Sequence, residues 1–222
     1  MSARDFLWSL RWRLSVATRR LRGIRGDFEQ GELSARAAAL TSRWVTRWPE
    51  FAPSPTGQTH LHSRYSGEFI RFHSLPDAGT RPFTPEEMVE AIRRHMTALE
   101  DLVELAGDST LVVVAADWGR NDLFGAWSRS VFPGSWPWLS WRDTRDEEGD
   151  PLTYFWVTPV TELAKLKHSL ERVVEEDGQI YITDDGMNWL YHPYDGGADI
   201  YLTSIDDANT LRARHEHWRP GD

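Results

Sequence analysis

The stretch QIYITDDGMNWLYHPYDGGADIYLT, residues 179–203, decides the fold. Two β-prone runs, Gln179–Thr183 and Asn188–Tyr191, flank an Asp-Gly turn at Asp184–Gly186. An Asp-Gly pair between such runs is a strong signal for a β-hairpin. A further strand is expected at Ala198–Thr203, so this part of the chain predicts consecutive strands of one sheet.

The nine-residue run Tyr191–Asp199 connects the hairpin to that further strand. Pro193 fixes its φ angle, and Gly196 and Gly197 allow backbone angles that other residues avoid. A histidine, two tyrosines and two aspartates lie within the same run. The run therefore predicts an irregular corner that holds polar groups in fixed positions, and it is the first candidate for a site.

The rest of the chain alternates between helical and strand periodicity. The surest helix begins at Thr84-Pro85-Glu86-Glu87, which combines a cap, a proline at the first helical position and a capping-box glutamate, and it ends near Gly107. The other expected elements are helices at 32–48, from Thr158-Pro159 to 177, and from Ser204 to about 218, with strands at 66–76, 111–116, 139–142 and 153–157 and a long loop at 118–138.

These elements predict an α+β fold. We expect a mixed, largely antiparallel sheet of about six strands, flanked by helices and preceded by an N-terminal helical extension. The proline-rich loop at 49–57 is the best candidate boundary. The expected domains are therefore a helical extension at 1–57 and an α+β domain at 58–222.

Charge is distributed unevenly along the chain. Residues 1–26 hold seven arginines and one acidic residue, a net charge of +6, and apolar residues recur there at helical spacing. Because the whole chain carries −9, the remaining residues carry −15. The basic helix either docks on the acidic body, which we favour, or it contacts an anionic membrane surface or a nucleic acid, or it is a targeting peptide. The acidic body argues against specific nucleic-acid binding and favours a basic protein partner.

Composition limits the possible chemistry. The chain has no cysteine, which excludes disulfides, thiolate metal sites and cysteine nucleophiles and fits a location in the cytoplasm. No apolar stretch approaches the roughly 20 residues that cross a bilayer, so a transmembrane segment is not expected. The chain has twelve tryptophans, and we expect most of them in the core.

A second polar motif lies in the strand expected at 66–76. Strand alternation places Arg71 and His73 on one face. We expect Asp195 and Asp199 to accept hydrogen bonds or to pair with Arg71. The candidate cluster is therefore Arg71, His73, His192, Tyr194, Asp195 and Asp199. No residue is assigned to a metal, and no cofactor is expected.

The motifs Arg71-Phe72-His73-Ser74-Leu75-Pro76 and Tyr191–Asp199, with Trp218 in the last helix, resemble a family of bacterial proteins known only as a domain of unknown function. The resemblance covers residues 66–218. It implies an α+β domain found mainly in bacteria, and it brings no activity, substrate or catalytic residue with it.

Two classes of function stay open. The first is a binding module without catalysis, immunity-like or regulatory, whose acidic surface covers a basic protein; this is the preferred interpretation. The alternative is a metal-dependent hydrolase or nuclease that uses the His/Asp cluster. An enzyme is the less favoured class, because the nucleophile elbow, the phosphate-binding glycine loop and the zinc-binding His-Glu-x-x-His motif are missing from the sequence. In the non-catalytic interpretation, His192, Asp195 and the glycine pair form a tight structural corner.

Overall fold

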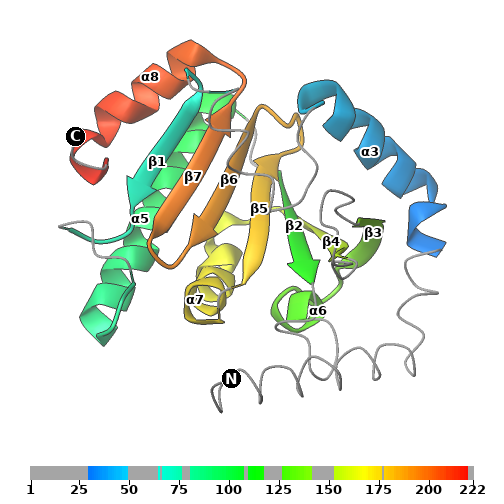
Figure 1. Ribbon diagram of the computed structural model, residues 1–222, viewed down its shortest axis with the longest axis horizontal. Helices are drawn as coiled ribbons and strands as arrows, with labels where there is room; N and C mark the ends of the chain where they lie inside the picture. Colours follow the sequence, from blue (N-terminus) through cyan, green and yellow to red (C-terminus); the bar gives the residue numbers. More distant parts are fainter. Residues whose placement is uncertain are drawn as a thin grey trace, which may run out of the picture. The chain divides into compact units, whose positions relative to one another are not determined.

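The computed structural model describes residues 30–49, 65, 67–76, 81–107, 110–117, 127–141, 153–176 and 178–219 (Figure 1). The basic segment 1–26, the segment 50–64 with His60 and His62, and the acidic turn 143–150 lie outside the described residues. The chain forms two compact units. The larger comprises residues 43–114 and 159–222, and the smaller residues 1–42 and 115–158. The expected boundary near residue 57 stays a prediction.

The fold is α+β, as predicted, and it is built on an open, antiparallel sheet. The sheet has seven strands in the order β1-β7-β6-β5-β2-β4-β3, where about six were expected. The pairs β1–β7, β7–β6, β6–β5 and β4–β3 are antiparallel. The strands are β1 (Phe69–His73), β2 (Leu111–Asp117), β3 (Trp136–Trp141), β4 (Thr153–Val160), β5 (Gln179–Asp184), β6 (Trp189–Tyr194) and β7 (Gly197–Leu202).

Local sequence signals specify both ends of helix α5 (Pro85–Ala106). Thr84 accepts a hydrogen bond from the Glu87 N–H, and the Glu87 side chain accepts one from the Thr84 N–H, so the expected capping box forms. At the other end Gly107 adopts a left-handed φ of 67°. The buried face of α5 carries Ala91, Ala98, Leu99 and Leu102, among others.

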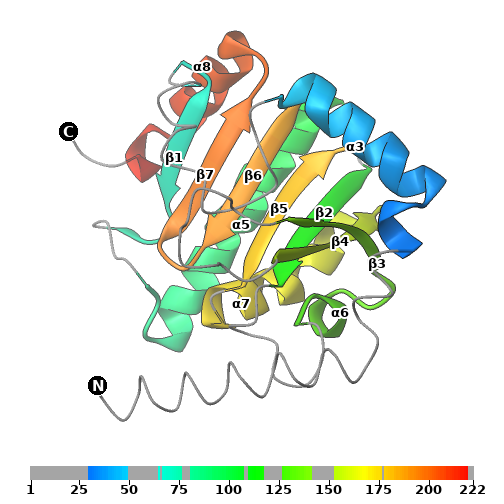
Figure 2. The same cartoon turned by 45° about the vertical axis from the view of Figure 1, so that its right-hand side comes forward.

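Three helices of the larger unit pack on one face of β1, β7 and β6. They are α5, α7 (Leu166–Glu176) and α8 (Ile205–Arg214), which is followed by the 3₁₀ turn η4 (Glu216–Trp218). Figure 2 shows α5 and α7 behind the strands. The core between these layers is apolar, as burial against helices requires. It includes Ile70, Phe72, Leu99, Leu102, Leu170, Val173, Ile200 and Leu211.

The smaller unit is held together by aromatic residues of β3 and β4. The Trp138 indole N–H donates to Thr41 Oγ at 2.9 Å. The guanidinium of Arg36 lies 4.4 Å from the Trp136 ring centroid. Helix α3 (Ala35–Arg47) begins in this unit and ends in the larger one, where Trp44 of the helix and Trp48, directly after it, are buried. Seven of the eight tryptophans whose side chains are described are buried, so the expectation of core tryptophans is confirmed for them.

Three expected elements are wrong in type or extent. The segment 158–177 was expected to be helical from Thr158-Pro159, but β4 continues to Val160 and α7 begins at Leu166. A cap residue followed by proline resembles a helix start, yet here the strand pairing prevails. The loop expected at 118–138 contains helix α6 (Trp127–Val131) and the start of β3. The last helix ends at Arg214, and η4 replaces its expected final turn.

The expectation of an irregular corner at Tyr191–Asp199 is also wrong in extent. Strand β6 runs through Pro193 to Tyr194, and β7 begins at Gly197, so only two residues form the turn. The residues of β6 that bond to β7 are the even-numbered ones, because Asn188 O accepts from the Thr203 N–H. Pro193 therefore directs its missing N–H away from β7 and toward β5, so the proline leaves the β6–β7 ladder intact.

Among the residues with described structure, no helix is both long and apolar enough to cross a membrane.

Gly197 generates a prediction about stability. A Cβ atom at this position would lie 1.9 Å from the Phe72 carbonyl oxygen on β1, a contact that the backbone cannot relieve without shifting a strand. We expect Gly197→Ala to lower the free energy of unfolding by about 3 kcal/mol or more, measured by urea denaturation.

Gly107→Ala is the matched control for this substitution. A Cβ at Gly107 would meet nothing within 4 Å, and only its left-handed φ is unfavourable, at a cost of about 1–2 kcal/mol. Equal losses for the two variants would contradict the proposed clash.

Candidate functional site

An ion pair joins the two sequence motifs across neighbouring strands. Arg71 of β1 lies opposite Asp199 of β7 in the strand register. Arg71 Nε donates to Asp199 Oδ1 at 2.7 Å, and Arg71 Nη2 donates to Asp199 Oδ2 at 2.8 Å. The pairing expected from the sequence therefore forms, and it is bidentate, the strongest geometry for an arginine and a carboxylate.

The two partners of this pair differ in exposure. The Asp199 side chain is only 1% exposed, whereas 39% of the Arg71 side chain reaches the surface. The hydrogen bonds to Asp199 raise the pKa of Arg71 above its ordinary value. The Tyr194 hydroxyl lies 3.5 Å from Asp199 Oδ1, at the limit of a hydrogen bond, and burial followed by the charge of Asp199 raises the pKa of Tyr194. Arg71 thus supplies the positive charge that a buried carboxylate needs.

His192 lies on the other side of Asp199, in the neighbouring position of β6. Its Nε2 atom is 3.0 Å from Gln179 Oε1, and its ring is tilted against Tyr181 at 5.0 Å between centroids. Burial is the main reason that the pKa of His192 falls to about 4. The imidazole is therefore neutral at neutral pH and is held by packing.

Asp195 and Gly196 form the turn between β6 and β7. Asp195 Oδ1 accepts from the Gly196 N–H at 2.7 Å. Ser74, directly after β1, donates from its hydroxyl to Asp195 O at 2.8 Å and from its N–H to Gly196 O at 3.1 Å. The Arg81 guanidinium approaches Asp195 to 3.9 Å. Asp195 therefore organises the turn, and Ser74 fastens the turn to β1.

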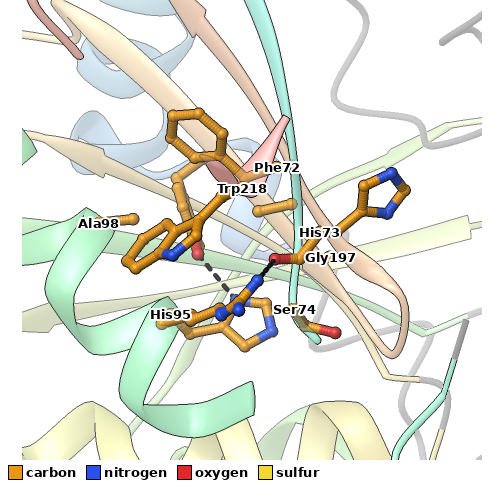
Figure 3. Close-up of a pocket in the computed structure, with 10 residues that line it drawn as sticks. Phe72, His73, Ser74, His95, Ala98, Gly197 and Trp218 are labelled. Carbon is orange, nitrogen blue, oxygen red and sulfur yellow. Dashed lines mark hydrogen bonds between the residues drawn. The ribbon is translucent and has the colours of Figure 1, made fainter. Parts of the chain in front are cut away.

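A second buried polar pair lies behind these strands, on the side of α5. His95 Nδ1 is 2.7 Å from the Tyr191 hydroxyl, and both residues are buried. Burial lowers the pKa of His95 to about 4. Figure 3 shows His95 at a small cavity beside Phe72, Ala98 and Trp218. The cavity measures about 10 Å³, room for at most one water molecule.

The structure brings together four of the six candidate residues and separates two. Arg71, Asp199, His192 and Tyr194 lie side by side on one face of the sheet. Asp195 belongs to the turn. His73 lies opposite Gly197, its carbonyl oxygen accepts from Arg94 at 3.1 Å, and its imidazole points away from the cavity in Figure 3.

Sequence reasoning missed the contributions of Ser74, His95, Tyr191 and Arg94. Ser74 and Tyr191 were within the motifs, but only the strand register shows which groups they meet. Arg94 and His95 lie on the buried face of α5, where an amphipathic pattern would have counted them as polar interruptions. Within the described residues, no group of three or more His, Cys, Asp or Glu is placed to hold a metal ion.

Together these features define a class: an α+β domain whose polar sequence motifs bond to one another within an antiparallel sheet. The chain belongs to the family described as Domain of unknown function (DUF3885), which matches residues 58–221. No curated protein and no solved structure matches the chain.

The Arg71–Asp199 pair predicts strong energetic coupling. Arg71→Ala leaves a buried carboxylate without its cation, so we expect a loss of about 2–4 kcal/mol, less than for a fully buried pair because Arg71 is partly exposed. A double-mutant cycle with Asp199→Ala, read from urea unfolding, is expected to give a coupling energy above about 1 kcal/mol.

The exposed pair Lys165–Glu162, with 64% of each side chain at the surface, is the control cycle, with an expected coupling of about 0.5 kcal/mol or less. Equal coupling in the two cycles would show that Arg71 and Asp199 do not depend on each other.

Two buried histidines, His95 and His192, predict a loss of stability in acid. Their pKa values are near 4 in the folded protein and about 6.5 in the unfolded chain. The unfolded state therefore binds more protons below pH 6.5, and stability falls as the pH drops from about 6.5 to 4. The expected loss is on the order of 3 kcal/mol for each histidine.

His192→Phe is expected to reduce this pH dependence, measured by unfolding at pH 7.5, 5.5 and 4.5. His168→Phe on α7 is the control, because His168 is exposed and its removal leaves His95 and His192 in place. A pH dependence that persists unchanged in His192→Phe would rule out His192 as one of its sources.

Proposed function

We propose that this protein is a binding module that recognises a basic protein partner through the N-terminal end of α5. The observation that carries the proposal is a pair of exposed apolar side chains, Phe83 at 84% and Val89 at 70% exposure. Exposed apolar surface is typical of interaction sites, and both side chains belong to the first part of α5 and the residues before it. A non-catalytic, immunity-like or regulatory role in the cytoplasm is the corresponding expectation from the sequence.

A groove lies beside Phe83. It has a volume of about 520 Å³ and is lined by Arg81, Pro82, Phe83, Thr84, Pro85, Met88, Val174 and Glu175. An aromatic side chain next to a groove is a common interface anchor, because it buries a large area with little loss of conformational freedom. The groove therefore suits an apolar side chain of a partner, which would pack against Phe83 and Met88.

The charges around the groove favour a basic partner. Glu86 and Glu175 are exposed, and Glu87 of the capping box accepts from the Phe83 N–H at 2.7 Å. The nearest cation, Arg81, donates to Glu175 O at 3.0 Å and lies 3.9 Å from Asp195, so an acidic group already faces it. Lysine or arginine residues of the partner, next to its apolar anchor, would complement the glutamates around the groove.

The metal-dependent hydrolase or nuclease has less support. Asp199 directs both oxygens to Arg71, and Asp195 Oδ1 accepts from its own turn. A metal would have to replace these hydrogen bonds.

The test is affinity capture from the native host with three forms of the full chain: wild type, Phe83→Glu and Leu33→Glu. Leu33 is 88% exposed and does not line the groove, so Leu33→Glu is a matched change in charge and apolarity. We expect a basic partner that binds wild type and Leu33→Glu equally. Phe83→Glu should weaken its binding at least tenfold, about 1.4 kcal/mol, when the purified pair is measured by calorimetry.

Binding should also weaken with added salt, because the glutamates around the groove contribute electrostatic attraction that salt screens. Equal affinity of wild type and Phe83→Glu would reject the groove as the site. A divalent-metal-dependent hydrolytic activity that is lost in Asp199→Asn would reject the binding module in favour of the enzyme.

A further inference from the structure

Strand β1 is the end strand of the described sheet, and half of its backbone groups face outward. The Leu202 N–H donates to Glu68 O, and the Ser74 N–H donates to Gly196 O. In an antiparallel ladder the bonded positions alternate, so residues 68, 70, 72 and 74 face β7. The N–H and C=O groups of Phe69, Arg71 and His73 must then face the outer edge.

An arginine from α8 covers one end of this edge. Arg212 Nη2 donates to Gly67 O at 2.6 Å and to Phe69 O at 3.0 Å. Arg212 Nη1 donates to Asn209 Oδ1 at 2.8 Å, one turn earlier in the same helix, which orients the guanidinium. The outward carbonyls of Phe69 in β1 and of Gly67, two residues before it, are therefore both bonded to the Arg212 side chain.

An arginine from α5 covers the other end. Arg94 Nη1 donates to His73 O at 3.1 Å, and the Arg94 side chain is only 9% exposed. Glu90 accepts from Arg94 Nε at 2.8 Å, and the guanidinium lies 5.3 Å from the Trp218 ring centroid. Arg94 is therefore fixed on the edge by its neighbours.

The usual protection of an edge strand is weak here. Proteins commonly protect such strands with an unpaired charge or a proline on the edge itself. The sequence of β1 is Phe-Ile-Arg-Phe-His, rich in β-prone residues, and its one permanently charged side chain is neutralised by Asp199. The protection must come from elsewhere in the fold.

We propose that Arg212 and Arg94 close the outer edge of β1 against antiparallel pairing with β1 of a second copy of this chain. Pairing of the same edge from two copies is compatible with a two-fold axis, the commonest symmetry of protein dimers. The carbonyls that such a ladder would use are those of Phe69 and His73, which the two guanidiniums occupy. Release of either arginine exposes a template for strand addition.

The experiment compares Arg212→Met with Arg214→Met in the full chain. Methionine keeps the length of the side chain and removes its donors. Arg214 lies on the same helix but bonds to Asp101 and Glu104 of α5, so its removal changes the same charge without uncovering β1. Molar mass is measured by light scattering after size exclusion over a hundredfold range of concentration.

We expect Arg212→Met to self-associate at concentrations at least tenfold lower than Arg214→Met, and the double variant Arg94→Met/Arg212→Met lower still. Hydrogen exchange should show new protection of the Arg71 and His73 amides in the associated form. Adding His73→Pro to Arg212→Met removes one outward donor without touching the bonds to β7, and should restore the wild-type concentration dependence.

Unfolding curves of each variant separate this effect from general instability, because an unfolded chain would associate without protecting the edge amides. Equal association of Arg212→Met and Arg214→Met at matched stability would overturn the proposal. Association that persists with His73→Pro would overturn it as well.

Discussion

The bidentate bond between Arg71 and Asp199 is the constraint on which the larger unit depends. It joins an end strand to its neighbour and compensates a carboxylate that burial would otherwise make very costly. The β6–β7 turn is fastened to the same end strand by Ser74, and Gly197 allows the two backbones to approach. The polar residues of both motifs thus bond chiefly to one another.

This arrangement changes the meaning of a conspicuous sequence motif. Histidine, tyrosine and aspartate in a short run are the residue types of many active sites, and the same types also satisfy the polar demands of a buried corner. Here His192 is neutral and packed, Asp195 holds a turn, and Asp199 holds an arginine. The exposed apolar residues that the proposed function uses, Phe83 and Val89, lie on a different element and are ordinary in sequence.

The parts of the fold that could be predicted are those set by local rules. Thr84, Pro85, Glu87 and Gly107 specify both ends of α5 by themselves, and the structure agrees with them. The Arg71–Asp199 pair could be anticipated from opposite charges on expected strands. Pro159 and Pro193 were misread, because a proline suggests a helix start or a break and only the strand register shows which side of a ladder lacks a donor. The buried pair His95–Tyr191 depends on packing of a helix against a strand, which no local pattern encodes.

The position of β1 has a consequence for synthesis of the chain. Asp199, the partner of Arg71 on β7, lies 128 residues later in the chain. Arg212 of α8, which covers the edge of β1, comes later still. Contacts so distant in sequence form slowly, because a long loop must close first. On the ribosome β1 therefore waits until β7 and α8 have emerged. A nascent or prematurely ended product has an uncovered, β-prone segment, and such a species is a substrate for chaperones and proteases.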